Sequence, residues 1–162
     1  MQTPRFRALG IALVVLAALT AGCGSSSKSS SDPGTTTPGP CPFNGAMTPE
    51  TNPGAGAAAA TSLLSIQPTV SGCIDQLTFA FNPTLAASSV SYTAGQPQLV
   101  VTLKNTTYSG PTTLKTDKLQ YVKAISASSS ANETQVTLTL DKQRPFLERT
   151  SKVPPELQLS FG

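Results

Sequence analysis

Cys23 is the residue of this chain whose surroundings most clearly indicate a chemical reaction. Residues 1–7 carry two arginines, residues 8–19 form an uncharged apolar run, and the small residues Thr20–Gly22 stand directly before the cysteine. A charged zone, an apolar zone and a small-residue zone in this order are typical of a secretory signal peptide. A thiol at this point is a candidate for acylation, after which it becomes the mature N-terminus. The sequence therefore predicts a signal peptide over residues 1–22 and lipidation at Cys23.

Two other interpretations of this segment are a transmembrane helix and an ordinary cleaved signal. Spanning a bilayer needs roughly 20 apolar residues, which the run over residues 8–19 does not reach. An ordinary signal needs no cysteine here, nor the Gly-Ser run of residues 24–27. The segment resembles a bacterial lipobox, which implies a diacylglyceryl group. Two acyl chains suffice for stable anchoring, so we expect the protein on the extracytoplasmic face of the cell membrane.

The remaining cysteines, Cys41 and Cys73, are candidates for a disulfide. Disulfides persist in exported proteins, and closing this loop of about 32 residues stabilises a fold by roughly 3–4 kcal/mol. The alternative is a pair of thiols that bind a metal. The chain has no histidine and no Cys-x-x-Cys spacing, which favours the disulfide and predicts no metal site.

Composition excludes several function classes. Without histidine, Ser-His-Asp and Cys-His mechanisms are impossible, so no catalytic residues and no cofactor are predicted. The chain has 11 basic and 8 acidic residues, and removal of two arginines with the signal leaves 9 − 8 = +1. Nucleic-acid binders present a strongly basic face, which this balance does not predict.

Three cations near one turn are candidates for ligand binding. Lys142, Arg144 and Arg149 flank the turn before Phe146 and could present positive charge to an anionic wall polymer. Arginine suits carboxylates because its planar fork binds both oxygens. The alternative interpretation is that Asp141 pairs with Arg144 across the turn while Phe146 packs in the core.

The three tyrosines are the candidates for stacking on sugar rings. Tyr92, Tyr108 and Tyr121 have flat apolar faces, and we assign Tyr121 to the ligand site with the cations. The alternative is that all three are half-buried strand residues.

The elements that must position these residues are strands. Residues 23–60 are rich in Ser, Thr, Pro, Gly and Ala, which predicts a flexible linker. From residue 61 onward apolar and polar residues alternate, as half-buried strands require. The predicted strands are 62–66, 76–81, 89–93, 99–103, 119–126, 136–140, 145–150 and 157–161. The fold class is therefore all-β: an antiparallel β-sandwich of about seven to eight short strands over residues 61–162, after a disordered tether.

Three motifs resemble the AMIN-like domain of bacterial envelope lipoproteins, a family widespread in actinobacteria. They are the strand Asp75–Phe81, the turn Tyr108–Pro111 and the paired stretches Leu140–Phe146 and Pro154–Phe161. The resemblance covers residues 61–161. It implies a noncatalytic β-sandwich that binds peptidoglycan or a wall-associated partner, and no enzyme activity.

Function is therefore predicted as binding in the cell envelope. The alternative is an envelope carrier or chaperone for lipids, which needs a pocket of several hundred Å³. A small hydrolase is the third class, and the missing histidine argues against it.

Overall fold

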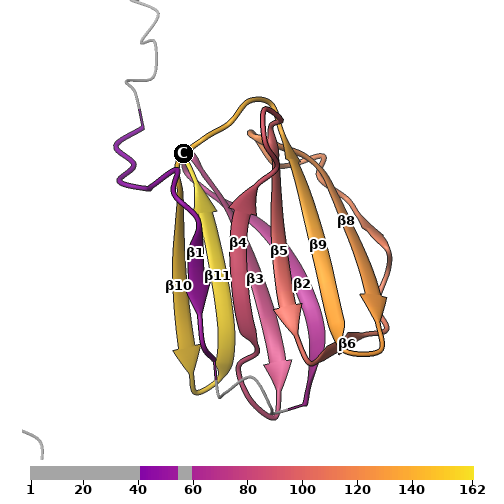
Figure 1. Cartoon of the computed structure of the whole chain (residues 1–162). Coiled ribbons are helices and arrows are strands. Elements are labelled where there is room, and N and C mark those ends of the chain that lie inside the picture. The colour runs from indigo at the N-terminus through magenta and orange to yellow at the C-terminus, as the bar shows by residue number, and fades with distance from the viewer. Residues whose placement is uncertain (1–40, 55–59) are drawn as a thin grey trace, which may run out of the picture. The chain divides into compact units, whose positions relative to one another are not determined.

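The computed structural model describes residues 41–54 and 60–162 and contains two β-sheets packed face to face (Figure 1). Cys23, the predicted signal peptide and residues 23–40 of the predicted linker lie outside the described residues. The strands are β1 (Glu50–Asn52), β2 (Thr61–Ser71), β3 (Ile74–Asn82), β4 (Ala87–Tyr92), β5 (Gln98–Lys104), β6 (Thr106–Tyr108), β7 (Thr113–Leu114), β8 (Val122–Ser130), β9 (Glu133–Leu140), β10 (Phe146–Lys152) and β11 (Pro155–Phe161). In this part of the chain, no helix is long and apolar enough to cross a membrane.

The core lies between the sheets and comes from one half of each alternating strand. In β3 the side chains of Leu77, Phe79 and Phe81 are buried, and the residues between them face away from the core. The same alternation holds in β5 and β9, and in β11 as far as Leu159, beyond which Ser160 is buried as well as Phe161. Strand alternation therefore places a second, polar set of side chains on the outer faces.

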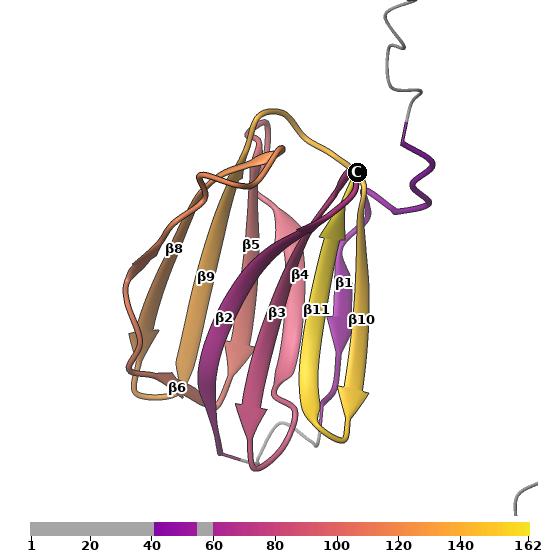
Figure 2. The same ribbon diagram turned by 180° about the vertical axis from the view of Figure 1, so that it is seen from behind.

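The two sheets are ordered β1-β4-β5-β9-β8-β7 and β10-β11-β3-β2-β6. All strand pairs are antiparallel except β2 with β6. Figure 2 shows the five-stranded sheet in front, with β2, β3, β11 and β10 side by side. The predicted all-β sandwich is confirmed. Three short strands, β1, β6 and β7, had no sequence prediction because each has only two or three residues and no alternation to detect.

The segment of residues 41–54 corrects the predicted linker, which extended to residue 60. Ala46 forms a bridge with Phe146 of β10, in the five-stranded sheet, and β1 then pairs with β4, in the six-stranded sheet. Asn52 also donates from Nδ2 to Oγ1 of Thr150 on β10 at 3.3 Å. This part of the linker thus belongs to the folded domain and connects both sheets along one side of the sandwich. Backbone pairing, which does not depend on apolar side chains, holds it there.

A disulfide fixes the start of this segment. Cys41 and Cys73 are bonded, with their Cα atoms 5.9 Å apart, so the predicted pairing is confirmed. Because Cys73 stands between β2 and β3, the bond attaches residues 41–44 to one end of the five-stranded sheet.

Candidate functional site

The outer face of the five-stranded sheet carries hydroxyl and amide side chains in register across four strands. Each cross-strand row joins one residue of β10, β11, β3 and β2. The rows are Leu147–Ser160–Gln76–Thr69, Arg149–Gln158–Thr78–Gln67 and Ser151–Glu156–Ala80–Ser65. Directly opposed residues on one face have Cβ atoms about 4.5–5.5 Å apart, so neighbouring groups can contact one ligand together. We refer to these three rows as the polar face.

A groove of about 320 Å³ lies at one end of the polar face. Arg149, Gln158 and Gln76 line it on the sheet side, and Phe43 lines it from the disulfide-bonded segment. Its other lining residues are Pro42, Asn44, Ser71, Ile74, Leu147 and Ser160. An aromatic ring, three amides and a guanidinium thus surround one hollow, which suits a ligand with both apolar and hydrogen-bonding groups.

The six-stranded sheet also has a polar outer face, but its chemistry differs. Its central rows are Ser89–Thr102–Gln135–Ser128 and Ser91–Val100–Thr137–Ser126. These rows hold short hydroxyls, Val100 and one amide. The next row on the same face contains Lys104 and Glu133, which form an ion pair with each other. A cation that takes part in neither ion pair of the described residues, together with the adjacent aromatic ring, therefore distinguishes the polar face of the five-stranded sheet.

Arg149 is the predicted ligand residue that the structure places on the polar face. Arg149 is exposed, and the residue opposite it on β11 is Gln158. Among the described residues, the ion pairs found are Lys104 with Glu133 and Arg144 with Asp141, so Arg149 is in neither. Its fork therefore remains available to a carboxylate.

Arg144 is arranged differently, because the protein itself occupies its fork. Its Nε and Nη2 donate to the two carboxylate oxygens of Asp141, each at 2.8 Å, and its Nη1 donates to the carbonyl oxygen of Gly162 at 3.3 Å. Its guanidinium carbon lies 3.8 Å from the centre of the Tyr121 ring. Only 16% of the Arg144 side chain is exposed. Of the two interpretations of this turn, the local pairing of Asp141 with Arg144 is the one found, and Phe146 is fully buried.

This pairing sets the protonation of both side chains. The hydrogen bonds from Arg144 lower the pKa of Asp141 from its ordinary value to about 2, against a smaller effect of burial. Conversely, the hydrogen bonds to Asp141 raise the pKa of Arg144. The pair is therefore ionised at any pH near neutrality, and the turn that it closes is fixed.

Tyr121 and Tyr92 hold this arginine in place from two elements. Tyr92 donates from its hydroxyl to the carbonyl oxygen of Arg144 at 2.6 Å, and the same hydroxyl accepts from the Arg144 amide at 3.0 Å. Burial is the main reason that the pKa of Tyr92 is raised. Both rings are half-buried against the core, as is Tyr108. In this arrangement Tyr121 stacks on a guanidinium of its own chain.

Asp75 fixes the position of Tyr121. Its carboxylate is fully buried and accepts three backbone hydrogen bonds, from Gln120 at 2.8 Å, Tyr121 at 2.7 Å and Val122 at 3.0 Å. The sequence showed Asp75 only as the first residue of a strand motif. A carboxylate that begins an otherwise apolar strand is the signal for such a buried acceptor.

Arg144 with Asp141, Tyr92 and Tyr121 forms an arginine cluster, which is connected to the groove through Gly162. A Cβ atom added to Gly162 would lie 2.5 Å from the Cβ of Phe43, so the absence of a side chain is what lets Phe43 approach. Arg144 holds the carbonyl of the same glycine. Arg144 and Tyr121 therefore position the groove rather than line it.

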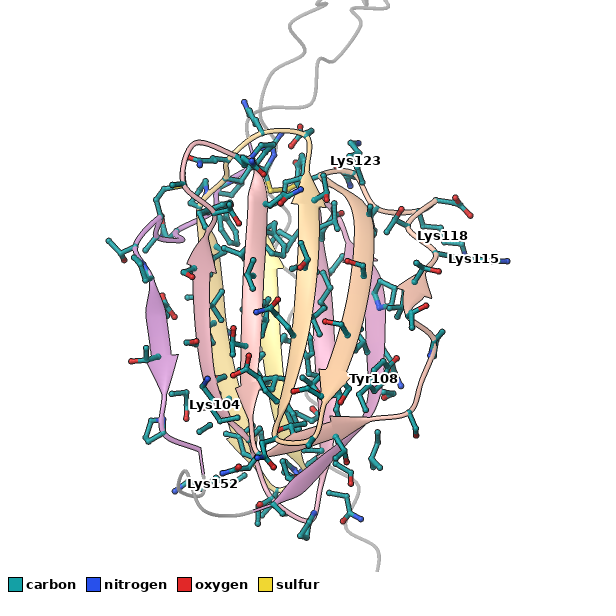
Figure 3. The ribbon with its side chains drawn as sticks, turned by 45° about the vertical axis from the view of Figure 1, so that its right-hand side comes forward. Lys104, Tyr108, Lys115, Lys118, Lys123 and Lys152 are labelled. Carbon is teal, nitrogen blue, oxygen red and sulfur yellow. A yellow bond between two sulfur atoms is a disulfide. The ribbon has the colours of Figure 1, made fainter. Side chains whose placement is uncertain are left out.

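Lys142 lies on the exposed turn, where its amide donates to Asp141 Oδ1 at 2.9 Å. Three other lysines, Lys115, Lys118 and Lys123, extend from the corner between β7 and the first residues of β8 (Figure 3). Lys123 donates to the carbonyl oxygen of Gln120 at 2.6 Å. The predicted cations are thus separated by role, since Arg149 lies in the groove, Arg144 in the positioning cluster and Lys142 on the turn.

A second hollow, of about 440 Å³, opens at the other end of the sandwich. Its lining combines Leu85 with Asn52, Pro53, Gly54, Pro83, Thr84, Thr150 and Lys152. The Oγ1 atom of Thr84 is buried there without a hydrogen-bond partner. Within residues 41–54 and 60–162, no group of three or more Cys, Asp or Glu side chains is arranged to hold a metal ion.

These features define a β-sandwich whose one outer face is equipped for binding. A family model described as AMIN domain matches residues 72–156, and the chain belongs to this family. Comparisons with curated proteins and with solved structures gave no match.

Membership of this family carries a general function. AMIN domains are noncatalytic binding domains associated with peptidoglycan in cell-wall proteins, and they act outside the cytoplasm in the cell envelope. The family match covers β3 to the beginning of β11, and therefore most of the polar face.

Proposed function

We propose that this protein is a noncatalytic lipoprotein, anchored to the membrane through Cys23, whose AMIN domain binds peptidoglycan or a wall-associated partner on the polar face. The observation that carries the proposal is the register of hydroxyls, amides and one guanidinium beside Phe43 in the groove. Residues 24–40 then serve as the tether between the lipid and the disulfide at Cys41.

The chemistry of the polar face fits a wall polymer because its groups are of two kinds. Gln76, Gln158 and Thr78 can each donate and accept hydrogen bonds, which matches the hydroxyls and amides of an amino-sugar and peptide polymer. Phe43 and Leu147 add apolar surface beside them. All of these side chains except Phe43 stand on strands whose other faces form the core, so they are held in place before a ligand arrives.

Co-sedimentation of the lipid-free protein, from residue 24 onward, with purified peptidoglycan tests this proposal. We expect the protein to sediment with peptidoglycan at low salt, and Gln158→Glu to reduce the bound fraction several-fold because it brings a carboxylate toward an acidic polymer. Gln135→Glu is the matched control, since Gln135 lies exposed on β9 of the other sheet. Protein that stays in the supernatant at low salt contradicts the proposal.

The anchor has its own test in cells. We expect Cys23→Ala to move the protein from the membrane fraction to the soluble extracytoplasmic fraction, because no acyl chain can then be attached. A Cys73→Ala variant controls for loss of a cysteine as such, since it removes only the disulfide. Membrane fractionation of the Cys23→Ala protein equal to wild type overturns the lipid assignment.

A further inference from the structure

We propose that the polar face recognises the peptide part of the wall polymer rather than its glycan, with Arg149 binding a carboxylate and Glu156 binding an amine of the same peptide. This inference rests on the proposed function and names the chemical class of its ligand. Peptide stems carry both carboxylates and amines, whereas the glycan offers mainly hydroxyl and N-acetyl groups. A face with one cation and one anion is therefore a face for a short zwitterionic peptide.

The register places the two charges at a useful separation. Arg149 is opposite Gln158 and Ser151 is opposite Glu156, so Arg149 and Glu156 are diagonal neighbours on one face. Diagonal neighbours of antiparallel strands lie about 7–8 Å apart, which is within the span of two peptide units. One extended peptide could therefore contact both groups at once.

Neither charge is used by the fold. The two ion pairs among the described residues join other side chains, so Arg149 and Glu156 are paired neither with each other nor elsewhere. Both side chains stand on strand positions that alternate with core residues, since Glu156 precedes buried Leu157 and Arg149 lies three positions beyond buried Phe146. No packing role accounts for either charge.

The groups between and beside the two charges suit a peptide backbone. Gln158 and Gln76 offer amides, and Thr78 a hydroxyl, each able to pair with a peptide N–H or C=O. Phe43 and Leu147 lie at the groove end, where a methyl group or small side chain of the peptide can be covered. Along the polar face, the groups therefore change from apolar at Phe43, through the amides, to the two charged side chains.

The experiment compares two polymers and two matched variants. Lipid-free protein is sedimented with intact peptidoglycan and with glycan strands from which the peptides have been removed enzymatically. We expect wild type to bind intact peptidoglycan at least about tenfold more tightly than the stripped glycan. Arg149→Gln should lower the affinity for intact peptidoglycan about tenfold and reduce the difference in affinity between the two polymers.

Lys152→Gln is the matched control, because Lys152 is on the same strand but lines the hollow at the other end of the sandwich. A urea unfolding curve for each variant verifies that it is folded. Exchanging the two charges in Arg149→Glu, Glu156→Arg should restore part of the binding that Arg149→Glu alone removes, because a peptide with both charges can bind in the reverse direction.

The outcomes separate the two claims. Equal binding of wild type to intact and stripped polymer, or equal affinity of Arg149→Gln and Lys152→Gln, overturns the peptide inference and leaves the proposed function standing. Failure to bind either polymer overturns the proposed function itself.

Discussion

Asp75→Asn tests whether a single buried carboxylate holds the corner on which the arginine cluster depends. The carboxylate receives three backbone N–H groups, two on Oδ2 and one on Oδ1. An asparagine has almost the same shape, yet its amide nitrogen is a donor and cannot accept. In either orientation, at least one N–H therefore faces another donor.

The magnitude follows from these bonds. With the amide oxygen toward Tyr121 and Val122, one bond is lost at Gln120 and two become neutral. A hydrogen bond to a charged group contributes about 1.5–3 kcal/mol and a neutral one about 0.5–1.5 kcal/mol. The sum of one lost bond and two weakened bonds is about 3.5–6 kcal/mol, a large part of the stability of a domain of this size.

Urea unfolding followed by tyrosine fluorescence measures the loss, since the chain has three tyrosines and no tryptophan. Asp117→Asn is the control, because Asp117 is an exposed aspartate near the same corner. We expect Asp75→Asn to lower the urea concentration at the unfolding midpoint strongly and to leave the dependence of the unfolding free energy on urea unchanged. The unfolding free energy of Asp117→Asn should stay within about 0.5 kcal/mol of wild type. A difference below 1 kcal/mol between the two variants refutes the reasoning.

Three further predictions concern the same end of the molecule. Arg144→Lys keeps the charge but loses the two-pronged bond to Asp141 and the stacked ring, so urea unfolding should show a loss of about 1–2 kcal/mol; no loss would mean that the fork contributes nothing. Because the pKa of Asp141 is lowered to about 2 on folding, its stabilisation is present above about pH 4 and lost as the pH falls toward 2. Because solvent screens this partly exposed pair, its contribution to the free energy of unfolding is about 1 kcal/mol. The stability of Asp141→Asn, measured as the pH is lowered from about 4 to about 2, should therefore lack this loss. Replacing Cys41 and Cys73 together with serine should cost about 3–4 kcal/mol in urea unfolding and weaken peptidoglycan sedimentation; unchanged sedimentation would show that Phe43 needs no disulfide to line the groove.

The long strands could be predicted from the sequence because every second residue of a half-buried strand is apolar. Each of the eight predicted ranges overlaps a strand of the structure. The segment before β2 was missed for a physical reason. Glu50–Asn52 is held by backbone pairing with β4, and its own side chains carry no apolar pattern.

The candidate site was harder to predict, because a sequence lists charges without their partners. Arg144 and Arg149 look equivalent in the sequence, five residues apart with prolines and aromatics nearby. The sequence offered the pairing of Asp141 with Arg144 as one of two interpretations, and the fold decides for it and shows that Arg149 is in neither ion pair of the described residues. Gln76 and Gln158 carry no signal of their own in the sequence, because they occupy the polar half of strands that are recognised by their apolar half.

A comparison of the two outer faces of the sandwich shows that polar strand residues form a candidate site only where other groups lie beside them. Both sheets alternate in the same way, and both present rows of hydroxyls. The six-stranded sheet exposes these hydroxyls beside Lys104 and Glu133, which are paired with each other, whereas the disulfide brings Phe43 to the five-stranded sheet beside Arg149. One wall of the groove, formed by Pro42, Phe43 and Asn44, therefore comes from outside the sheet, from a segment that pairs with both layers. Binding on this face should consequently depend on residues 41–44 as much as on the strands beneath them.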